Sequence, residues 1–190
     1  MNWILASGSP RRRELLEMLG VPDLTIRPAT GPERATPGAG PEQTVRELSL
    51  HKAQEVAQTC APEDIIIAAD TIVYLDGAIL GKPKDHDDAV RMLTALSGRE
   101  HIVYTGVAVL RGGELRQTAE HTAVRFRTLT PEEIERYIAT GEPMDKAGAY
   151  GIQGRGALFV AHLDGDYFNV MGLPLCRLGQ LLNELGVELL

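Results

Sequence analysis

The stretch Ile65-Ile66-Ile67-Ala68-Ala69-Asp70-Thr71-Ile72-Val73-Tyr74 decides the fold class of this chain. Its first half, Ile65 to Ala69, is an uninterrupted apolar run that begins with three isoleucines, and Asp76-Gly77 closes the stretch with a turn signal. A short apolar run that is rich in isoleucine and bounded by a turn predicts a buried strand. The sequence therefore indicates a sheet with covered faces, in which this strand is central.

Helical and strand patterns alternate on both sides of this stretch. Helices are predicted over 10–19, 42–59, 87–96, 130–140 and 175–185, the fourth opened by a capping box at Thr130-Pro131-Glu132-Glu133. Further strands are predicted over 3–6, 101–110 and 122–126, and the segments 157–162 and 167–171 flank a turn at 164–166. Crossover units followed by hairpins predict an α/β fold with a mixed sheet. We expect a single domain over residues 1–190.

Composition excludes several classes of protein. Nineteen Lys and Arg face 26 Asp and Glu, so the net charge is −7, which disfavours general nucleic-acid binding. No window approaches the roughly 18 apolar residues of a membrane helix, and no secretory signal is visible. Cys60 and Cys176 match no metal or redox spacing, and the histidines match no zinc spacing. We expect reduced thiols and a cytoplasmic location.

The first candidate site is the turn Ser7-Gly8-Ser9-Pro10 with the arginines that follow it. A helix is predicted to begin at Pro10, with Ser9 placed to cap it. Arg11 and Arg12 lie in its first turn, where the helix dipole favours anions. Small residues let a ligand approach the backbone, so the segment predicts a phosphate cradle of N–H groups and guanidinium groups. The alternative is a solvated basic turn.

Two charged residues interrupt apolar patterns elsewhere. Lys52 falls on the apolar stripe of the helix over 42–59, so it either extends its ammonium to solvent or points it into an anion-binding cleft. Asp70 lies toward the carboxyl end of the apolar strand, where ligands bind in open α/β sheets. A carboxylate there needs a metal, a base or a proton as partner.

A fourth cluster combines Gly81-Lys82-Pro83 with the glycine-rich segment over 141–154. Lys82 on a turn is suited to bind a phosphate, although Pro83 rules out a phosphate-loop motif. Gln153 both donates and accepts hydrogen bonds, so it could recognise the edge of a base. The many glycines of this segment favour a functional loop.

These clusters together favour a triphosphate as substrate. Its charge would occupy the scattered bases, while Asp70 with Glu33 could hold a hard divalent ion such as Mg²⁺ or Mn²⁺. Such an ion polarises a phosphoryl oxygen and activates water. Hydrolysis would then need no covalent intermediate.

The chain resembles the Maf family of nucleoside triphosphate pyrophosphatases. The resemblance covers nearly the whole chain and depends on separate motifs in the right order, namely 5–16, 69–73, 81–83, 104–107, 145–154 and 165–175. It implies a long mixed sheet flanked by helices, with a cleft between two lobes, as in inosine triphosphate pyrophosphatases. It also implies a divalent metal, a nucleoside triphosphate substrate and a homodimer in the cytoplasm. Composition adds the expectation of no nucleic-acid and no membrane partner.

The same resemblance implies roles for individual residues. Asp70 matches the family's catalytic base, and the phosphate-side positions are Ser7, Arg12, Lys52 and Lys82. The positions that separate subfamilies are Arg11, Thr71 and Gln153, and this chain has the residues of the branch acting on dTTP and UTP. The implied reaction is metal-assisted attack of water at the α-phosphate, which releases the monophosphate and pyrophosphate.

Some alternatives stay open at this point. Relatives often carry two adjacent acids near residue 33, whereas this chain has only Glu33, so Glu42 or Asp145 could replace it as a metal ligand. Asp70 could take a proton from water or ligate the metal, since a carboxylate suits both roles. The alternative function is a non-catalytic nucleotide-binding regulator linked to cell division.

Overall fold

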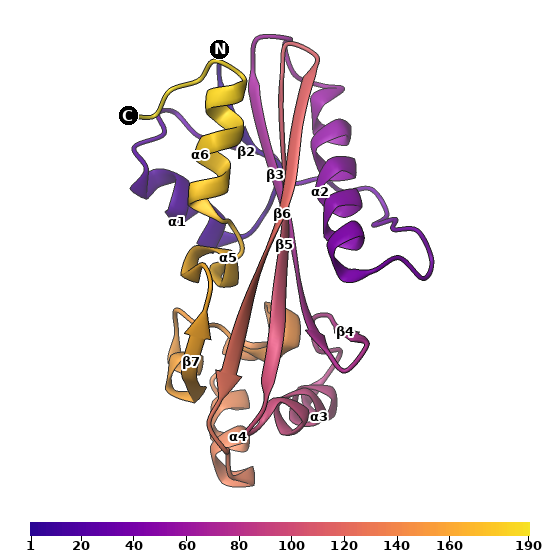
Figure 1. Cartoon of the computed structure of the whole chain (residues 1–190), viewed down its shortest axis with the longest axis vertical. Coiled ribbons are helices and arrows are strands. Elements are labelled where there is room, and N and C mark those ends of the chain that lie inside the picture. The colour runs from indigo at the N-terminus through magenta and orange to yellow at the C-terminus, as the bar shows by residue number, and fades with distance from the viewer. The chain divides into compact units, whose positions relative to one another are not determined.

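The computed structural model describes all residues 1–190, and its strands form one mixed sheet (Figure 1). The strands are β1 (Trp3–Leu5), β2 (Thr25–Ile26), β3 (Ile65–Leu75), β4 (Ala78–Leu80), β5 (Glu100–Arg111), β6 (Glu114–Phe126) and β7 (Val160–Asp164). They pair in the order β2-β1-β3-β5-β6-β7, and β4 pairs with β3. Because β1 runs parallel to β2 and β3 while β4 and β7 pair antiparallel with β3 and β6, the predicted mixed α/β sheet is confirmed.

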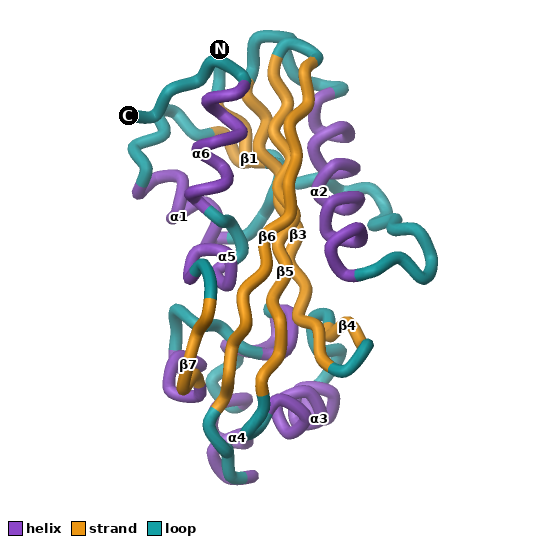
Figure 2. The backbone as a smooth tube through the Cα atoms, viewed as in Figure 1, coloured by secondary structure: helices purple, strands orange, loops and turns teal.

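Helices connect these strands (Figure 2). The α-helices are α1 (Pro10–Met18), α2 (Pro41–Ala57), α3 (His86–Leu96), α4 (Pro131–Ile138), α5 (Tyr167–Met171) and α6 (Leu175–Glu184). Short 3₁₀ turns are η1 (Glu142–Asp145), η2 (Ala147–Ala149) and η3 (Arg155–Phe159). None of the helices combines the length and the apolar character needed to cross a bilayer.

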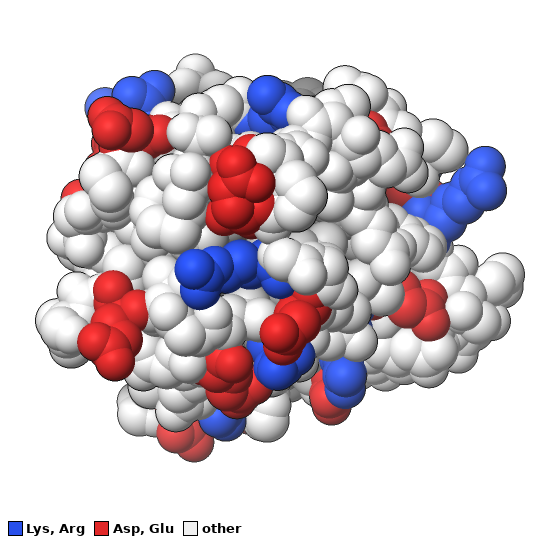
Figure 3. Space-filling model, turned by 90° about the horizontal axis from the view of Figure 1, so that it is seen from above, with Lys and Arg blue, Asp and Glu red and all other residues white.

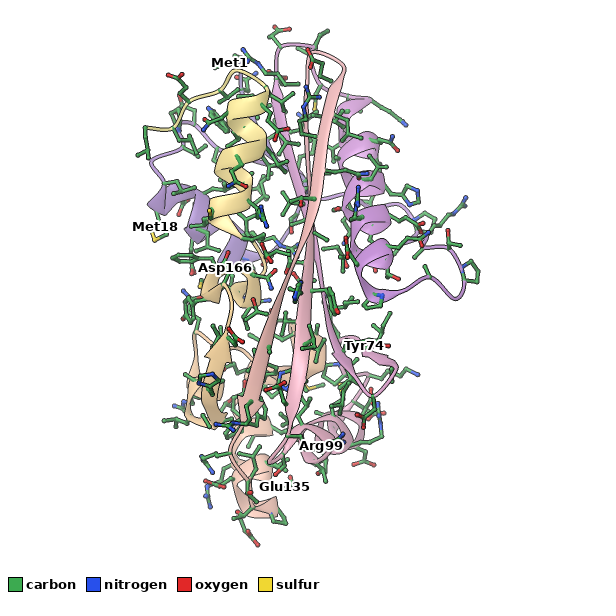
Figure 4. The ribbon with its side chains drawn as sticks, viewed as in Figure 1. Met1, Met18, Tyr74, Arg99, Glu135 and Asp166 are labelled. Carbon is green, nitrogen blue, oxygen red and sulfur yellow. The ribbon has the colours of Figure 1, made fainter.

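Most predicted elements are confirmed within a few residues, and two predictions are wrong, namely the start of β6 and the cap at Ser9. β6 begins at Glu114, not at 122, because residues 115–120 continue the strand at half-buried positions that show no apolar alternation. The segment over 167–171 is the helix α5, since Asp166, labelled in Figure 4, accepts the N–H of Phe168 at 2.7 Å and opens a helical turn. Ser9 precedes α1 but makes no capping hydrogen bond through its side chain.

The chain divides into two compact units, each assembled from separate stretches of sequence. The first unit comprises Met1–Asp70, Thr105–Glu120 and Gly172–Leu190, and the second comprises Thr71–Tyr104 and His121–Met171. β3, β5 and β6 each contribute residues to both units.

In the first unit, one face of the sheet packs against α2, whereas α1 and α6 lie on its other side (Figure 1). The contact with α2 is made by small and branched apolar residues, namely Ile4, Ala6, Ala53, Val56, Ile66, Ala68 and Ala108. Side chains alternate between the faces of a strand. Asp70, two residues beyond Ala68, therefore faces α2 as well.

Gly106 of β5 lets α2 approach the sheet closely. A Cβ atom at this position would lie only 2.1 Å from the main-chain oxygen of Val45. No side chain can occupy such a space, so glycine is required where the helix backbone meets the strand. This contact fixes the height of α2 over the sheet and hence the position of Lys52 on it.

The second unit is built on an aromatic core. The imidazole of His101 packs edge-on against Phe126 and Tyr150, and its Nε2 lies 2.8 Å from the Tyr150 hydroxyl. Burial lowers the pKa of His101 to about 4, so the ring is neutral at neutral pH. The predicted capping box of α4 is present, with Thr130 and Glu133 each accepting the other's backbone N–H.

Candidate active site

The turn after β1 and the start of α1 are joined by the buried side chain of Arg12. Arg12 lies in the first turn of α1, and its Nη1 donates to Ser7 Oγ at 2.9 Å. Its Nε donates to the main-chain oxygen of Gly172 at 2.8 Å. Both Ser7 and Arg12 are more than nine-tenths buried. The alternative of a solvated basic turn is therefore wrong for Arg12.

Charges of both signs surround the Arg12 guanidinium. Burial lowers the pKa of Arg12 to about 10, Asp70 and Glu33 raise it, and the neighbouring Arg11 lowers it. Arg12 therefore stays protonated at neutral pH. Arg11, Asp70 and Glu33 are therefore near enough to Arg12 to act on its charge.

Lys52 joins the two carboxylates of the site. Its Nζ donates to Asp70 Oδ1 in a short contact and to Glu33 Oε1 at 2.8 Å. The Lys52 and Asp70 side chains are 19% and 12% exposed, whereas the Glu33 side chain is 64% exposed. Lys52 therefore does not extend to solvent, and its ammonium neutralises a carboxylate that the β3 strand holds in a largely buried place.

Two glutamates of α2 fix the loop that carries Glu33. One binds the backbone before Glu33, and the other binds the backbone after it. Glu55 Oε1 accepts the backbone N–H groups of Thr30 and Gly31 at 2.7 and 3.0 Å. Glu47 Oε2 accepts the N–H of Thr36 at 2.7 Å, and Glu47 Oε1 accepts its hydroxyl at 3.0 Å. Nothing in the sequence pattern distinguished these two residues from solvated helix glutamates.

Among the three acids considered as partners of Asp70, the structure brings Glu33 to it. Glu42 lies in the first turn of α2 and pairs with Arg46 at 4.0 Å. Asp145 belongs to the second unit, where it pairs with Lys146 at 2.6 Å.

The second unit holds the remaining predicted residues. Lys82 is exposed on the turn after β4, and Thr71 is half-buried in β3. The N–H of Gly148 donates to the main-chain oxygen of Gly81 at 3.0 Å, so the predicted association of these two segments is confirmed. Gln153 is exposed in the turn before η3.

The donor set of the first unit fits a hard divalent cation. No three His, Cys, Asp or Glu residues cluster as a metal cage. Two carboxylates nevertheless converge on one ammonium, so a cation already stands between Asp70 and Glu33. Magnesium is usually held by one or two carboxylates together with water and substrate phosphates, which this pair would allow.

Charged side chains elsewhere are mixed in sign. On the face drawn in Figure 3, basic and acidic groups are interspersed among uncharged ones, and no broad basic area appears there. By contrast, Arg11, Arg12 and Lys52 outnumber Asp70 and Glu33 at the site, although the chain as a whole carries a charge of −7. These five groups together carry a net positive charge, unlike the chain as a whole, which favours binding of an anion.

Comparison with known proteins identifies the family of this chain. The model of the family described as Maf-like protein matches residues 2–185. A Moorella thermoacetica protein named dTTP/UTP pyrophosphatase is 53% identical over 187 residues, covering 97% of this chain and 95% of its own length. A Symbiobacterium thermophilum protein with the same name is 51% identical over 183 residues, covering 96% of this chain and 93% of its own length.

The fold also has a counterpart among solved structures. A HAM1 protein from Coxiella burnetii aligns with a TM-score of 0.54 at 16% identity, covering 97% of this chain and 99% of its own. At this identity the likeness concerns the fold alone, and it confirms the expected fold class.

Proposed function

Since the chain belongs to the Maf family, we propose that it hydrolyses dTTP and UTP to the nucleoside monophosphate and pyrophosphate. The observation that carries this proposal is the convergence of Asp70 and Glu33 on Lys52, beside the buried guanidinium of Arg12. A carboxylate that can act on water lies there among cations that can hold phosphates. The names of the relatives support the substrate and the bond that is cleaved.

In this proposal, Ser7, Arg12 and Lys52 bind the phosphate chain. Arg12 is held by Ser7 and Gly172, so its guanidinium is placed before substrate arrives and loses little side-chain entropy on binding. Lys52 supplies a compact positive charge from α2. Lys82, which the structure exposes on a turn of the second unit, is proposed as a further phosphate ligand.

Asp70 is proposed as the group that orients water and accepts its proton during attack at the α-phosphorus. Its neighbours Lys52 and Arg12 stabilise the negative charge that develops on the phosphoryl oxygens. Pyrophosphate leaves as the bond between the α- and β-phosphates breaks. A carboxylate in this place could alternatively ligate the metal, and both roles need its negative charge.

Asp70 and Glu33 are proposed to hold the divalent cation, Mg²⁺ or Mn²⁺, because their oxygens surround one positive charge already. When bound, such an ion supplies polarisation of the phosphoryl oxygen and a lower pKa of water. Lys52 must then share the two carboxylates with the ion, and its ammonium remains available to the phosphates.

Arg11, Thr71 and Gln153 are proposed to select the base, because the resemblance matches them to the branch acting on dTTP and UTP.

We further propose that residues 1–190 act as one catalytic domain, since the family match and the relatives extend along nearly the whole chain. A homodimer that works on free nucleotides in the cytoplasm completes the proposal. Light scattering tests the dimer, and a gel shift at physiological salt tests nucleic-acid binding.

The proposed activity is tested with a panel of nucleoside triphosphates and Mg²⁺ or Mn²⁺, scoring pyrophosphate against orthophosphate. We expect pyrophosphate release that is fastest with dTTP and UTP. Asp70→Asn should lower kcat at least about 100-fold while substrate binding persists. The matched control is Asp76→Asn, which changes an exposed carboxylate at the β3–β4 turn. Full turnover by Asp70→Asn would refute the role of Asp70, and nucleotide binding without turnover by the parent would indicate the non-catalytic regulator.

A further inference from the structure

The turn that carries Gln153 is folded around the carboxylate of Glu142. Glu142 Oε2 accepts the backbone N–H of Arg155 at 2.9 Å. Its Oε1 accepts the N–H of Gly156 at 3.1 Å and the hydroxyl of Tyr137 at 2.8 Å. The backbone immediately after Gln153 is therefore tied to one carboxylate through two hydrogen bonds.

The backbone before Gln153 is tied to the same pair of side chains. The N–H of Gly151 donates to the hydroxyl oxygen of Tyr137 at 3.1 Å. That hydroxyl in turn donates to Glu142, so Tyr137 links both ends of the turn. Residues 151 and 155, two positions before and two after Gln153, thus depend on Tyr137 and Glu142.

Gly154 shows how closely the turn fits this carboxylate. A Cβ atom on Gly154 would lie 2.5 Å from each carboxylate oxygen of Glu142. Any side chain at this position would displace the carboxylate, so only glycine allows the backbone to approach Glu142 this closely. In the sequence, Gly154 was one of the glycines that favoured a functional loop. In the structure, Gly154 packs against the carboxylate of Glu142 next to Gln153.

The ionised carboxylate of Glu142 strengthens the hydrogen bonds that hold the turn. Burial raises the pKa of Glu142, but the hydrogen bonds from the N–H groups of Arg155 and Gly156 lower it by more. The pKa of Glu142 therefore lies below its usual value. Burial raises the pKa of Tyr137, so its hydroxyl keeps its proton at neutral pH. Lys146 Nζ donates to the main-chain oxygen of Glu142 at 2.6 Å and fixes the start of the loop.

We propose that Glu142, acting with Tyr137, is a positioning residue that sets nucleobase selectivity by holding the turn that presents Gln153. This inference rests on the proposed function, in which Gln153 selects the base. Glu142 itself touches the backbone around Gln153, so its effect on the reaction passes through that residue. Loss of its charge should leave phosphate chemistry intact and impair discrimination between bases.

The experiment compares Glu142→Gln and Tyr137→Phe with the parent and with Glu135→Gln as control. Glu135, labelled in Figure 4, lies on α4 in the same unit and pairs with His86. The readout is the ratio of kcat/KM for dTTP and UTP to kcat/KM for GTP. We expect the ratio to fall about 10- to 100-fold in Glu142→Gln, and in the same direction in Tyr137→Phe, because small displacements of a positioned group cost that much. Glu135→Gln should keep the parental ratio.

A merely structural role would lower kcat/KM equally for every triphosphate, and that result would overturn the proposal. If Glu142→Gln does not fold, the isosteric Tyr137→Phe variant decides the question by the same ratio. Gln153→Glu is measured alongside. If the ratio of kcat/KM values changes for Gln153→Glu but not for Glu142→Gln and Tyr137→Phe, only the positioning role of Glu142 is overturned. Unchanged ratios in all three overturn it together with the proposed role of Gln153.

Discussion

Replacing Lys52 by Met removes the ammonium that Asp70 and Glu33 share and retains most of the side chain's length. Breaking a fully buried ion pair from one side costs about 3–5 kcal/mol, because the remaining charge stays desolvated. Here the Lys52 and Asp70 side chains are 19% and 12% exposed, so water screens part of the loss. We therefore expect Lys52→Met to lower the free energy of unfolding by about 2–3 kcal/mol.

The measurement is urea unfolding followed by circular dichroism, with the thermal midpoint as a second readout. A loss of this size should lower Tm by roughly 4–12 °C in a chain of this length. Asp70→Asn in the Lys52→Met background should restore part of the stability, because it removes the unpaired charge. The coupling energy of this double-mutant cycle should reach at least about 1 kcal/mol.

Arg46→Met is the matched control, since Arg46 lies on the same helix with a side chain 42% exposed and an ion-pair distance of 4.0 Å. Its effect should stay within about 0.5 kcal/mol. The reasoning is refuted if Lys52→Met costs no more than this control, or if the Lys52 and Asp70 changes are additive.

Further expectations concern loop anchoring, helix packing and acid stability. Glu55→Ala should raise the Mg²⁺ concentration needed for half-maximal pyrophosphate release, because it frees the loop carrying Glu33; an unchanged metal titration would contradict this. Gly106→Ala should lower the free energy of unfolding by more than about 3 kcal/mol or prevent folding, since its Cβ would lie 2.1 Å from Val45 O; soluble expression and chemical unfolding test this. The pKa of His101 in the folded protein is about 4, below the usual 6.5. The contribution of His101 to the free energy of unfolding is therefore complete above pH 6.5 and is lost as the pH falls toward 4. His101→Gln should flatten the stability profile by up to about 3 kcal/mol between these pH values, and a parallel profile would argue against it.

Local chemistry explains which parts of the site the sequence could reveal. Arg12, Lys52 and Asp70 each break a local pattern, as a base at a helix start, a lysine on an apolar stripe and an acid in an apolar strand. Such conflicts between residue type and pattern are typical of functional sites. The family resemblance then implied roles for these residues, and those roles stay predictions, whereas the contact of Lys52 with Asp70 is present in the structure.

The supporting residues were not visible in the sequence because their partners are backbone groups. Glu55 reaches Thr30 across 25 positions, and Glu142 reaches Arg155 across 13. Every residue except proline has an N–H group, so no pairing of side-chain types marks these contacts. The same reason explains β2 and β4, whose short strands are defined by main-chain partners rather than by an apolar pattern.

These hidden contacts follow one physical rule in both units. Glu47 and Glu55 hold the loop of Glu33, and Glu142 holds the turn of Gln153, each through backbone N–H groups that lower the pKa of the carboxyl. A carboxyl with a depressed folded pKa stabilises the fold above its unfolded pKa and loses that effect as the pH falls through the folded value. These hydrogen bonds therefore hold both loops at neutral pH. A small acidic protein can thus use its excess of carboxylates to order the loops that present its functional residues.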